Sequence, residues 1–299
     1  MRHLLDIDDL SGDELRTVLD LSEAVAPRHV LDGRGVALVF EKPSARTRNS
    51  MELAVFQLGG HPVTIRPDEV GLDTRETAED IVRTLAGYHA VVCARVFDHS
   101  LLERMAAVRV VPVVNLLSDR AHPMQAIADM LTIKQEFGGL DGIAVAYVGD
   151  ANNVCRSLAI ACGMLGVPIR VGCPPDHQFD DDDMDRIHAA GADIELTNRP
   201  EEAVGGAQVV YTDVWTSMGQ EEEADERRQD FEGYTVDQHL MHLAAPEAVF
   251  LHCLPAHRGE EVAAEVIDGR QSRVWPQAEN RMHAARGLLW WLVDEAGES

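Results

Sequence analysis

Short apolar runs alternate with longer segments in which apolar residues recur every three or four positions, and this pattern continues along the whole chain. The runs expected to form strands lie at 35–40, 61–65, 89–95, 110–116, 143–149, 169–173, 193–197, 208–214 and 248–254. The intervening segments have the spacing of amphipathic helices. Strands that alternate with helices in this way predict an α/β protein whose sheets are mainly parallel.

A glycine cluster, FGGLDG at 137–142, divides these elements into two sets. It follows a helix that is expected to begin near Pro123. We therefore predict two similar-sized domains, 1–137 and 138–280, each a mainly parallel sheet flanked by helices. The last segment, 281–299, carries apolar residues at helical spacing and is expected to form a helix that returns to the first domain.

The charge of the chain limits its partners. Asp and Glu number 51 against 26 Lys and Arg, a formal charge of -25. Such a surface disfavours nucleic acid and anionic membranes. Only Lys42 and Lys134 are lysines, so nearly all positive charge is arginine. Few lysines and many acids are typical of proteins from extreme halophiles; the alternative is an acidic protein from a mesophile.

No apolar run reaches the roughly 18 residues that a membrane span needs, and the first residues lack the basic and apolar regions of a signal peptide. We therefore expect a cytoplasmic protein. The five cysteines are odd in number and form no CxxC pair, which argues against a disulfide framework or a zinc site. Cys155 and Cys162 lie seven apart on one helical face and are expected in the core. Cys253 differs because it follows a predicted strand.

The first candidate site follows the first strand, in the stretch EKPSARTR at 41–48. Ser44 is expected to cap a helix whose free N–H groups face an anion. Arg46 and Thr47 would add a guanidinium and a hydroxyl to that anion site. The stretch predicts a phosphate cradle, although it lacks the glycines and lysine of a Walker loop. The alternative is a capping serine followed by solvated arginines.

Other strand ends carry further polar residues, and in open α/β sheets ligands bind outside the carboxyl ends of the strands. In the first half the run at 89–95 ends on Arg95, and the motif HPMQ places His122 and Gln125 at a helix start. The candidate residues at or just after the ends of strands in the second half are Asn152, Asn153, Asp213, Ser217, Met218 and Cys253. The first half thus offers anion donors, and the second offers an acid, amides and a thiol.

Five segments, FEKPSARTRNSME, HPMQ, DVWTSMGQE, HCLP and ENRMH, resemble the aspartate/ornithine carbamoyltransferase family in order and spacing. The pair SMG and HCLP favours ornithine as the acceptor. Two positions depart from the family pattern. Ala45 stands where threonine is usual, and it keeps the backbone N–H. Gly71 stands where the ornithine enzymes usually have the glutamine of a loop that reaches a neighbouring subunit.

The resemblance implies transfer of the carbamoyl group from carbamoyl phosphate to the δ-amine of L-ornithine, giving L-citrulline and phosphate. It implies no cofactor and no metal. The residues implied to bind carbamoyl phosphate are Ser44, Ala45, Arg46, Thr47, Arg95, His122, Gln125, Cys253, Leu254 and Arg281. Those implied to bind ornithine are Asn153, Asp213, Ser217 and Met218. The implied catalytic residues are Arg95, His122, Asp213 and Cys253.

In this interpretation Arg95 and His122 polarise the carbamoyl oxygen, and Cys253 orients or deprotonates the δ-amine. Arg48, Glu52 and Lys42 are expected to form supporting pairs. A homotrimer or a multiple of trimers is implied. The alternatives are another acceptor (putrescine, acetylornithine or aspartate) or a non-catalytic regulatory relative, which would be expected to have lost its arginines or cysteine. A dinucleotide-dependent dehydrogenase is disfavoured because YVGDANNV lacks GxGxxG.

Overall fold

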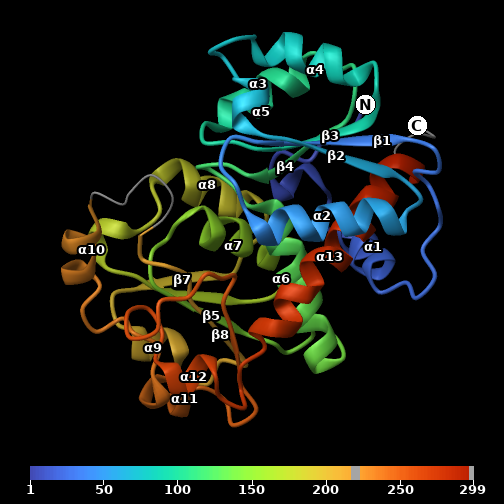
Figure 1. Cartoon of the computed structure of the whole chain (residues 1–299). Coiled ribbons are helices and arrows are strands. Elements are labelled where there is room, and N and C mark those ends of the chain that lie inside the picture. Colours follow the sequence, from blue (N-terminus) through green and yellow to red (C-terminus); the bar gives the residue numbers. More distant parts are fainter. Residues whose placement is uncertain (217–222, 296–299) are drawn as a thin grey trace. The chain divides into compact units, whose positions relative to one another are not determined.

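The structure, a computed structural model, describes residues 1–216 and 223–295 of the chain (Figure 1). Contacts between residues divide it into two compact units. Unit 1 comprises Met1–Leu131 and Glu279–Ser299, and unit 2 comprises Thr132–Ala278. Each unit is described by itself below.

Unit 1 contains a four-stranded parallel sheet with the order β2-β1-β3-β4. Its strands are β1 (Gly35–Phe40), β2 (His61–Ile65), β3 (His89–Arg95) and β4 (Val113–Leu117). Its helices before α6 are α1 (Gly12–Ser22), α2 (Ala45–Gln57), α3 (Pro67–Val70), α4 (Ala78–Ala86) and α5 (His99–Ala107). Figure 1 shows α4 and α5 on one face of this sheet and α2 and α1 on the other.

Burial on both faces explains why the central strands read as continuous apolar runs rather than alternating ones. Ala37 and Val39 of β1 pack with Val92 of β3 in a core that α4 and α5 cover. Residues 36–39 of β1 are all fully buried. At the edge of the sheet, β2 is only partly buried, and its apolar run is correspondingly shorter.

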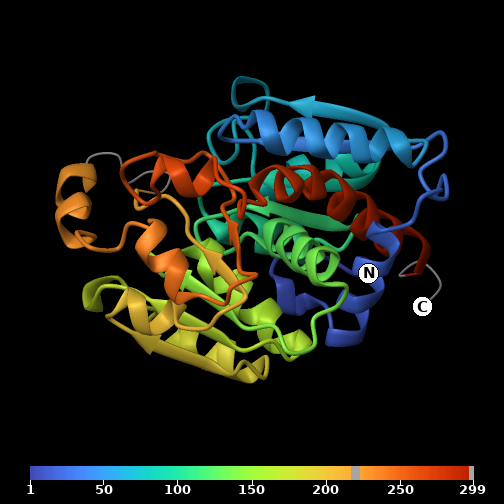
Figure 2. The same ribbon diagram turned by 90° about the horizontal axis from the view of Figure 1, so that it is seen from below.

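The C-terminal helix α13 (Val274–Trp290) ends within unit 1 and is followed by a short π-helical turn (Trp291–Glu295). Arg286 donates to the backbone carbonyl of Ser22 at 2.7 Å and to Gln57 Oε1 at 3.1 Å. A Cβ on Gly287 would lie 2.1 Å from Ser22 Oγ, so only glycine allows this approach to α1. In Figure 2 the dark-red helix runs beside α2. The predicted return of the last helix to the first sheet is confirmed.

Unit 2 contains a five-stranded parallel sheet with the order β7-β6-β5-β8-β9. Its strands are β5 (Val145–Val148), β6 (Ile169–Gly172), β7 (Ile194–Thr197), β8 (Val209–Tyr211) and β9 (Val249–Leu251). Its helices are α7 (Asn153–Leu165), α8 (Asp181–Ala189), α9 (Pro200–Val204), α10 (Ala224–Asp230), α11 (Gln238–Leu243) and α12 (Ala264–Ile267). Figure 1 shows α7 and α8 on one face and α9, α11 and α12 on the other.

The predicted fold class is confirmed, because every predicted strand overlaps an observed strand in its sheet. The division into units falls inside α6 (Pro123–Phe137), between Leu131 and Thr132, whereas the sequence places a domain boundary after this helix. The boundary at residue 137 therefore stays a prediction for the limit of an independently folding domain.

Within the described part of the chain, no helix has both the length and the apolar character that a membrane crossing requires.

Candidate active site

The N-terminus of α2 forms the first part of the candidate site. Ser44 has extended backbone angles, and its Oγ accepts a hydrogen bond from the N–H of Thr47 at 3.4 Å, as its prediction as an N-cap requires. Its hydroxyl lies 3.1 Å from Thr47 Oγ1. Ala45 and Arg46 follow and are exposed. Within the described residues Arg46 has no ion pair with a carboxylate, so its guanidinium is available to an anion.

Two arginine side chains from distant segments of unit 1 contact the hydroxyl of Thr47. Arg281 donates to it at 2.8 Å from α13, and Arg95 donates to it at 3.4 Å from the end of β3. The other Nη of Arg281 donates to Gln125 Oε1 at 2.6 Å. Gln125 in turn donates to Asp129 at 2.8 Å, which fixes the orientation of its amide. The structure thus brings together four residues that the sequence places far apart, and all four are buried.

His122 lies directly before α6 and is 3% exposed. Burial lowers the pKa of its imidazole well below the usual value, and the positive charges of Arg281, Arg95 and Arg46 lower it further. The ring is therefore neutral at physiological pH. A neutral imidazole can still donate one N–H to a carbonyl oxygen, which suits the predicted polarising role.

Supporting pairs surround this cluster. Arg48 Nε donates to Glu52 at 2.8 Å, and Glu52 also accepts from Thr64 at 2.6 Å, so this predicted pair is confirmed. The ammonium of Lys42 lies 5.8 Å from the centre of the Phe97 ring, within the range of a cation–π contact.

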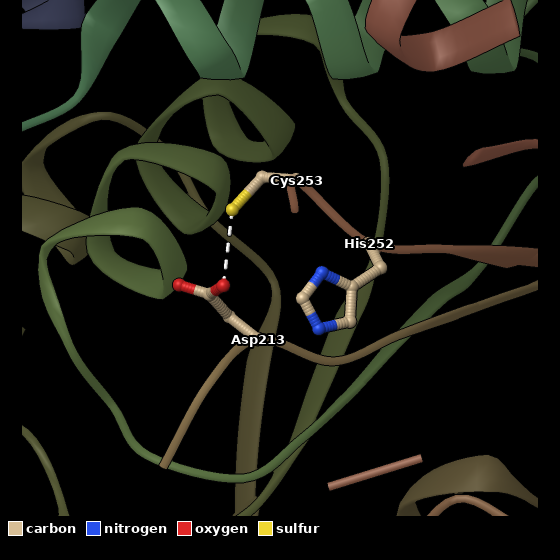
Figure 3. Close-up of side chains that lie close together, drawn as sticks. All are labelled: Asp213, His252 and Cys253. Carbon is tan, nitrogen blue, oxygen red and sulfur yellow. Dashed lines mark hydrogen bonds between the residues drawn. The ribbon is translucent and has the colours of Figure 1, made fainter. Parts of the chain in front are cut away.

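In unit 2 the candidate residues follow β8 and β9. Asp213 comes two residues after β8, and Cys253 comes two residues after β9. Cys253 Sγ donates to Asp213 Oδ1 at 3.0 Å (Figure 3). The amide of Asn152 donates to the other carboxylate oxygen at 3.4 Å. Both oxygens of this buried carboxylate thus have a donor, and the cysteine is a thiol in this arrangement.

His252, beside Cys253, belongs to the scaffold of the site. Its Nδ1 accepts from the N–H of Leu254 at 2.9 Å, and its Nε2 lies 3.0 Å from Glu261, with both side chains fully buried. Asp213, His252 and Cys253 lie close enough to suggest a metal centre (Figure 3). Because both ring nitrogens are already engaged, His252 has no lone pair for a metal, so this group does not fit one. Its contact instead fixes Leu254, whose φ is 61°.

Asp150 and Arg227 form a buried ion pair that the sequence analysis missed. Arg227 donates both to Asp150 and to the carbonyl of Trp215, and so links the loops after β5 and β8. Burial raises the pKa of Asp150 to about 6, although Arg227 opposes the shift. A signal was present, because Asp150 directly follows Gly149 at the end of a buried strand.

Asn153 begins α7 and is half-buried, while Asn152 caps this helix by accepting from the N–H groups of Val154 and Cys155. Asn152 therefore both caps α7 and contacts Asp213, whereas the binding of ornithine by Asn153 stays a prediction. Cys155 is fully buried, as predicted. Two predicted ornithine ligands, Ser217 and Met218, lie outside the described residues.

Comparisons with known proteins assign the chain. The carbamoyl-P binding domain of aspartate/ornithine carbamoyltransferases matches residues 2–135, and the Asp/Orn binding domain of the same enzymes matches residues 141–292. The chain belongs to the aspartate/ornithine carbamoyltransferase family.

Within that family, the following three similar proteins are named ornithine carbamoyltransferase. The protein from Acidothermus cellulolyticus is 47% identical over 99% of this chain and 98% of the relative. The one from Haloquadratum walsbyi is 47% identical over 98% of each. The solved structure from Thermus thermophilus is 43% identical, covers 98% of this chain and 99% of its own, and has a TM-score of 0.90.

Proposed function

We propose that this chain transfers the carbamoyl group of carbamoyl phosphate to the δ-amine of L-ornithine, releasing L-citrulline and phosphate. The observation that carries the proposal is the cluster in which two buried guanidinium groups, of Arg95 and Arg281, meet the hydroxyl of Thr47 at the start of α2. Such a concentration of positive charge in a chain of -25 is the chemistry of a bound dianion. The family assignment and the names of its relatives support the same reaction.

The phosphate group is bound at the mouth of α2. The N–H groups of the first turn, the hydroxyls of Ser44 and Thr47 and the guanidinium groups of Arg46 and Arg95 supply its donors. Ala45 donates its backbone N–H, which is present whether residue 45 is alanine or threonine. Each bond from a charged donor is worth roughly 1.5–3 kcal/mol.

The carbamoyl group is polarised next to this phosphate. Arg95, His122 and Thr47 donate to its oxygen, which becomes an oxyanion when the amine attacks. Gln125 Oε1 already accepts from Arg281 and keeps a second lone pair for the carbamoyl NH₂. The carbonyl of Leu254 accepts from the same NH₂, and Arg281 and Cys253 complete the set of predicted contacts.

Ornithine is bound through residues of unit 2. Its α-ammonium group binds Asp213, where it replaces the weaker S–H donor of Cys253. Its carboxylate is bound by Asn153 and by the backbone of Ser217 and Met218. The exchange frees the thiol of Cys253 to contact the δ-amine.

The reaction then needs a neutral amine, whereas a free alkylamine is protonated at neutral pH. The nitrogen lone pair attacks the carbamoyl carbon and forms the C–N bond. The carbon–oxygen bond to phosphate breaks, phosphate leaves with the electron pair, and the nitrogen loses its extra proton. Holding the reactants in line can supply ~7–11 kcal/mol of the barrier. The donors of unit 1 stabilise the charge that develops.

We also propose a cytoplasmic homotrimer, or a multiple of trimers, on the strength of the family resemblance. Gly71 bears on the loop expected to reach a neighbour. Its φ is 52°, and a Cβ there would lie 3.0 Å from Arg75 Cδ. The backbone at residue 71 therefore favours glycine over the glutamine that is usual in the family. We propose that this loop makes no side-chain contact with another subunit through residue 71. Light scattering coupled to gel filtration tests the assembly.

A citrulline assay with a panel of amines tests the acceptor. Ornithine should be carbamoylated far faster than putrescine, acetylornithine or aspartate. Aspartate brings two carboxylates toward the buried acids Asp213 and Asp150, and putrescine has no carboxylate for the amides of α7. Turnover with another amine but not with ornithine would overturn the proposed acceptor.

A further inference from the structure

A polar network lies beneath the turn that carries His122. Ser118 Oγ is at its centre and is fully buried. It accepts from the N–H of Ala121 and from the amide of Asn115, both at 3.2 Å. The backbone N–H of Ser118 donates to the carbonyl of Ala121 at 3.0 Å. The turn that ends at His122 is therefore closed by hydrogen bonds on its buried side.

Asn115 fastens this turn to the start of the chain. Its fully buried amide group donates to the carbonyl of Leu5 at 2.9 Å and to that of Ala121 at 3.2 Å. Its own backbone N–H donates to the carbonyl of Leu4 at 2.7 Å. The position of the turn is thus set by β4 and by the N-terminal segment together.

His99 joins the turn to the neighbouring loop, which begins directly after Arg95. The imidazole Nδ1 of His99 lies 2.7 Å from Ser118 Oγ. The backbone N–H of His99 donates to the side chain of Asp119 at 2.9 Å, and the N–H of Asp119 donates to the carbonyl of Phe97 at 2.9 Å. One set of hydrogen bonds therefore connects the loops that carry Arg95 and His122.

The donors around Ser118 decide the protonation of His99. Two N–H groups point at Ser118 Oγ, and its hydroxyl hydrogen has two acceptors within reach, the carbonyl of Ala121 at 3.4 Å and His99 Nδ1 at 2.7 Å; the shorter contact favours His99 Nδ1 as the acceptor. If His99 Nδ1 carried a proton, its N–H would face the O–H of Ser118, and two donors would meet without an acceptor between them. Burial lowers the pKa of His99, and the positive charge of Arg120 lowers it further. The negative charges of Asp6, Glu103 and Asp119 raise this pKa and so oppose the shift.

We propose that Asn115, Ser118 and His99 are positioning residues that hold His122 and Gln125 toward the carbamoyl group, and that protonation of His99 loosens this hold. The inference rests on the proposed function of unit 1. Recognition of phosphate and recognition of the carbamoyl group should then be separable, because the phosphate is bound at the mouth of α2 whereas the network supports the start of α6. Damage to the network should cost recognition of the carbamoyl group and spare recognition of phosphate.

The test compares the affinities of carbamoyl phosphate and inorganic phosphate by titration calorimetry. In Ser118→Ala the preference for carbamoyl phosphate should fall about tenfold, as expected for a displaced hydrogen bond of a polar pair, with phosphate affinity unchanged. Ser22→Ala is the matched control, because Ser22 is a buried serine of unit 1 whose Oγ donates to the carbonyl of Val18 instead. An equal loss for both ligands, or a lower melting temperature with an unchanged preference, would overturn the proposal.

His99→Gln supplies a second measurement, because glutamine can accept from Ser118 but does not titrate. The wild-type preference should fall in acid, at a pH lower than the ordinary histidine pKa of about 6.5, because burial lowers the pKa of His99. The variant should keep its preference over the same range, and identical acid profiles for the two proteins would contradict the pH role. No amine is present in these titrations, so failure to make citrulline would overturn the proposed acceptor without touching this result.

Discussion

The two units carry clusters of polar side chains that differ in chemical character. In unit 1 the polar side chains are mutually bonded guanidinium, amide and hydroxyl groups, with Thr47 held by Arg95 and Arg281. In unit 2 the buried carboxylate of Asp213 accepts from a thiol and an amide. The first arrangement favours an anionic ligand, and the second favours a cationic one.

The difference shows how each half is organised before its ligand arrives. Two guanidinium groups of unit 1, those of Arg95 and Arg281, are held close together because both donate to the hydroxyl of Thr47. Among the described residues, the carboxylate of Asp213 accepts from a weak S–H donor and from an amide at 3.4 Å, and an ammonium group is a stronger donor than either. We therefore expect Asp213 to exchange a donor when ornithine binds.

The largest expected effect comes from removing the exposed arginine of the anion half. Arg46→Ala should lower kcat/KM for carbamoyl phosphate by about 10³-fold, since two charge-assisted bonds of roughly 2 kcal/mol each are lost. Arg48→Ala is the control, because that neighbouring arginine is occupied by Glu52. Calorimetry of carbamoyl phosphate binding checks the cause, and an unchanged affinity would refute it.

A smaller effect should follow in the cation half. Asp213→Asn should raise KM for ornithine by roughly 10- to 100-fold while carbamoyl phosphate binds as before, because only the ammonium loses its charged partner. Asp225→Asn removes an exposed carboxylate of the same unit and should change neither constant. Loss of carbamoyl phosphate affinity in Asp213→Asn would show that the halves are not chemically separate.

Added salt should affect the binding of the two substrates in opposite directions. A surface of charge -25 repels dianionic carbamoyl phosphate and attracts ornithine, and at molar KCl the Debye length falls to about 3 Å. We expect the melting temperature and the rate to rise together with KCl, the rate by roughly tenfold, while KM for ornithine increases. Thermal melts and citrulline assays from dilute buffer to multimolar KCl check this. Maximal activity and an unchanged melting temperature in dilute buffer would contradict the halophile interpretation.

The smallest effect concerns Asp150. Its pKa of about 6 exceeds the ordinary value of 3.8, so between these pH values the folded chain keeps a proton that the unfolded chain has lost. This carboxyl group therefore stabilises the fold less as the pH rises through the window. Asp150→Asn should lower the melting temperature by losing the contact with Arg227, and the deficit should shrink by roughly 2–4 °C between pH 4 and 7. A deficit that stays constant would contradict the raised pKa.

The sequence predicted the sheets well because buried parallel strands leave a strong local signal, as in residues 35–40. It overran the end of β8, predicted to 214 but observed to Tyr211, because Asp213 follows the ladder rather than joining it. Arg46 and Arg95 were predictable from their positions just after β1 and at the end of β3, whereas Arg281, inside α13, was implied only by the family resemblance. The bonding of Arg95 and Arg281 to one hydroxyl, that of Thr47, depends on tertiary packing and was not predictable.

The missed residues share a physical reason. Asp150 and Arg227 are 77 positions apart, so no local pattern pairs them. His252 and Glu261 likewise form a buried pair whose members each resemble an ordinary surface residue in the sequence. His99 would be read as a helix-start histidine until Ser118 is seen beside it. Pairs of this kind are set by the topology of the sheet, which the periodicity of a single chain does not contain.

The contact between Arg281 and Thr47 spans 234 positions of the chain and has a consequence for biosynthesis. Residues up to 131 leave the ribosome early and contain most of the first sheet, yet the guanidinium that completes the Thr47 cluster is translated almost last. A nascent chain halted before residue 281 lacks this donor. We therefore expect truncated products to bind carbamoyl phosphate more weakly than the full chain.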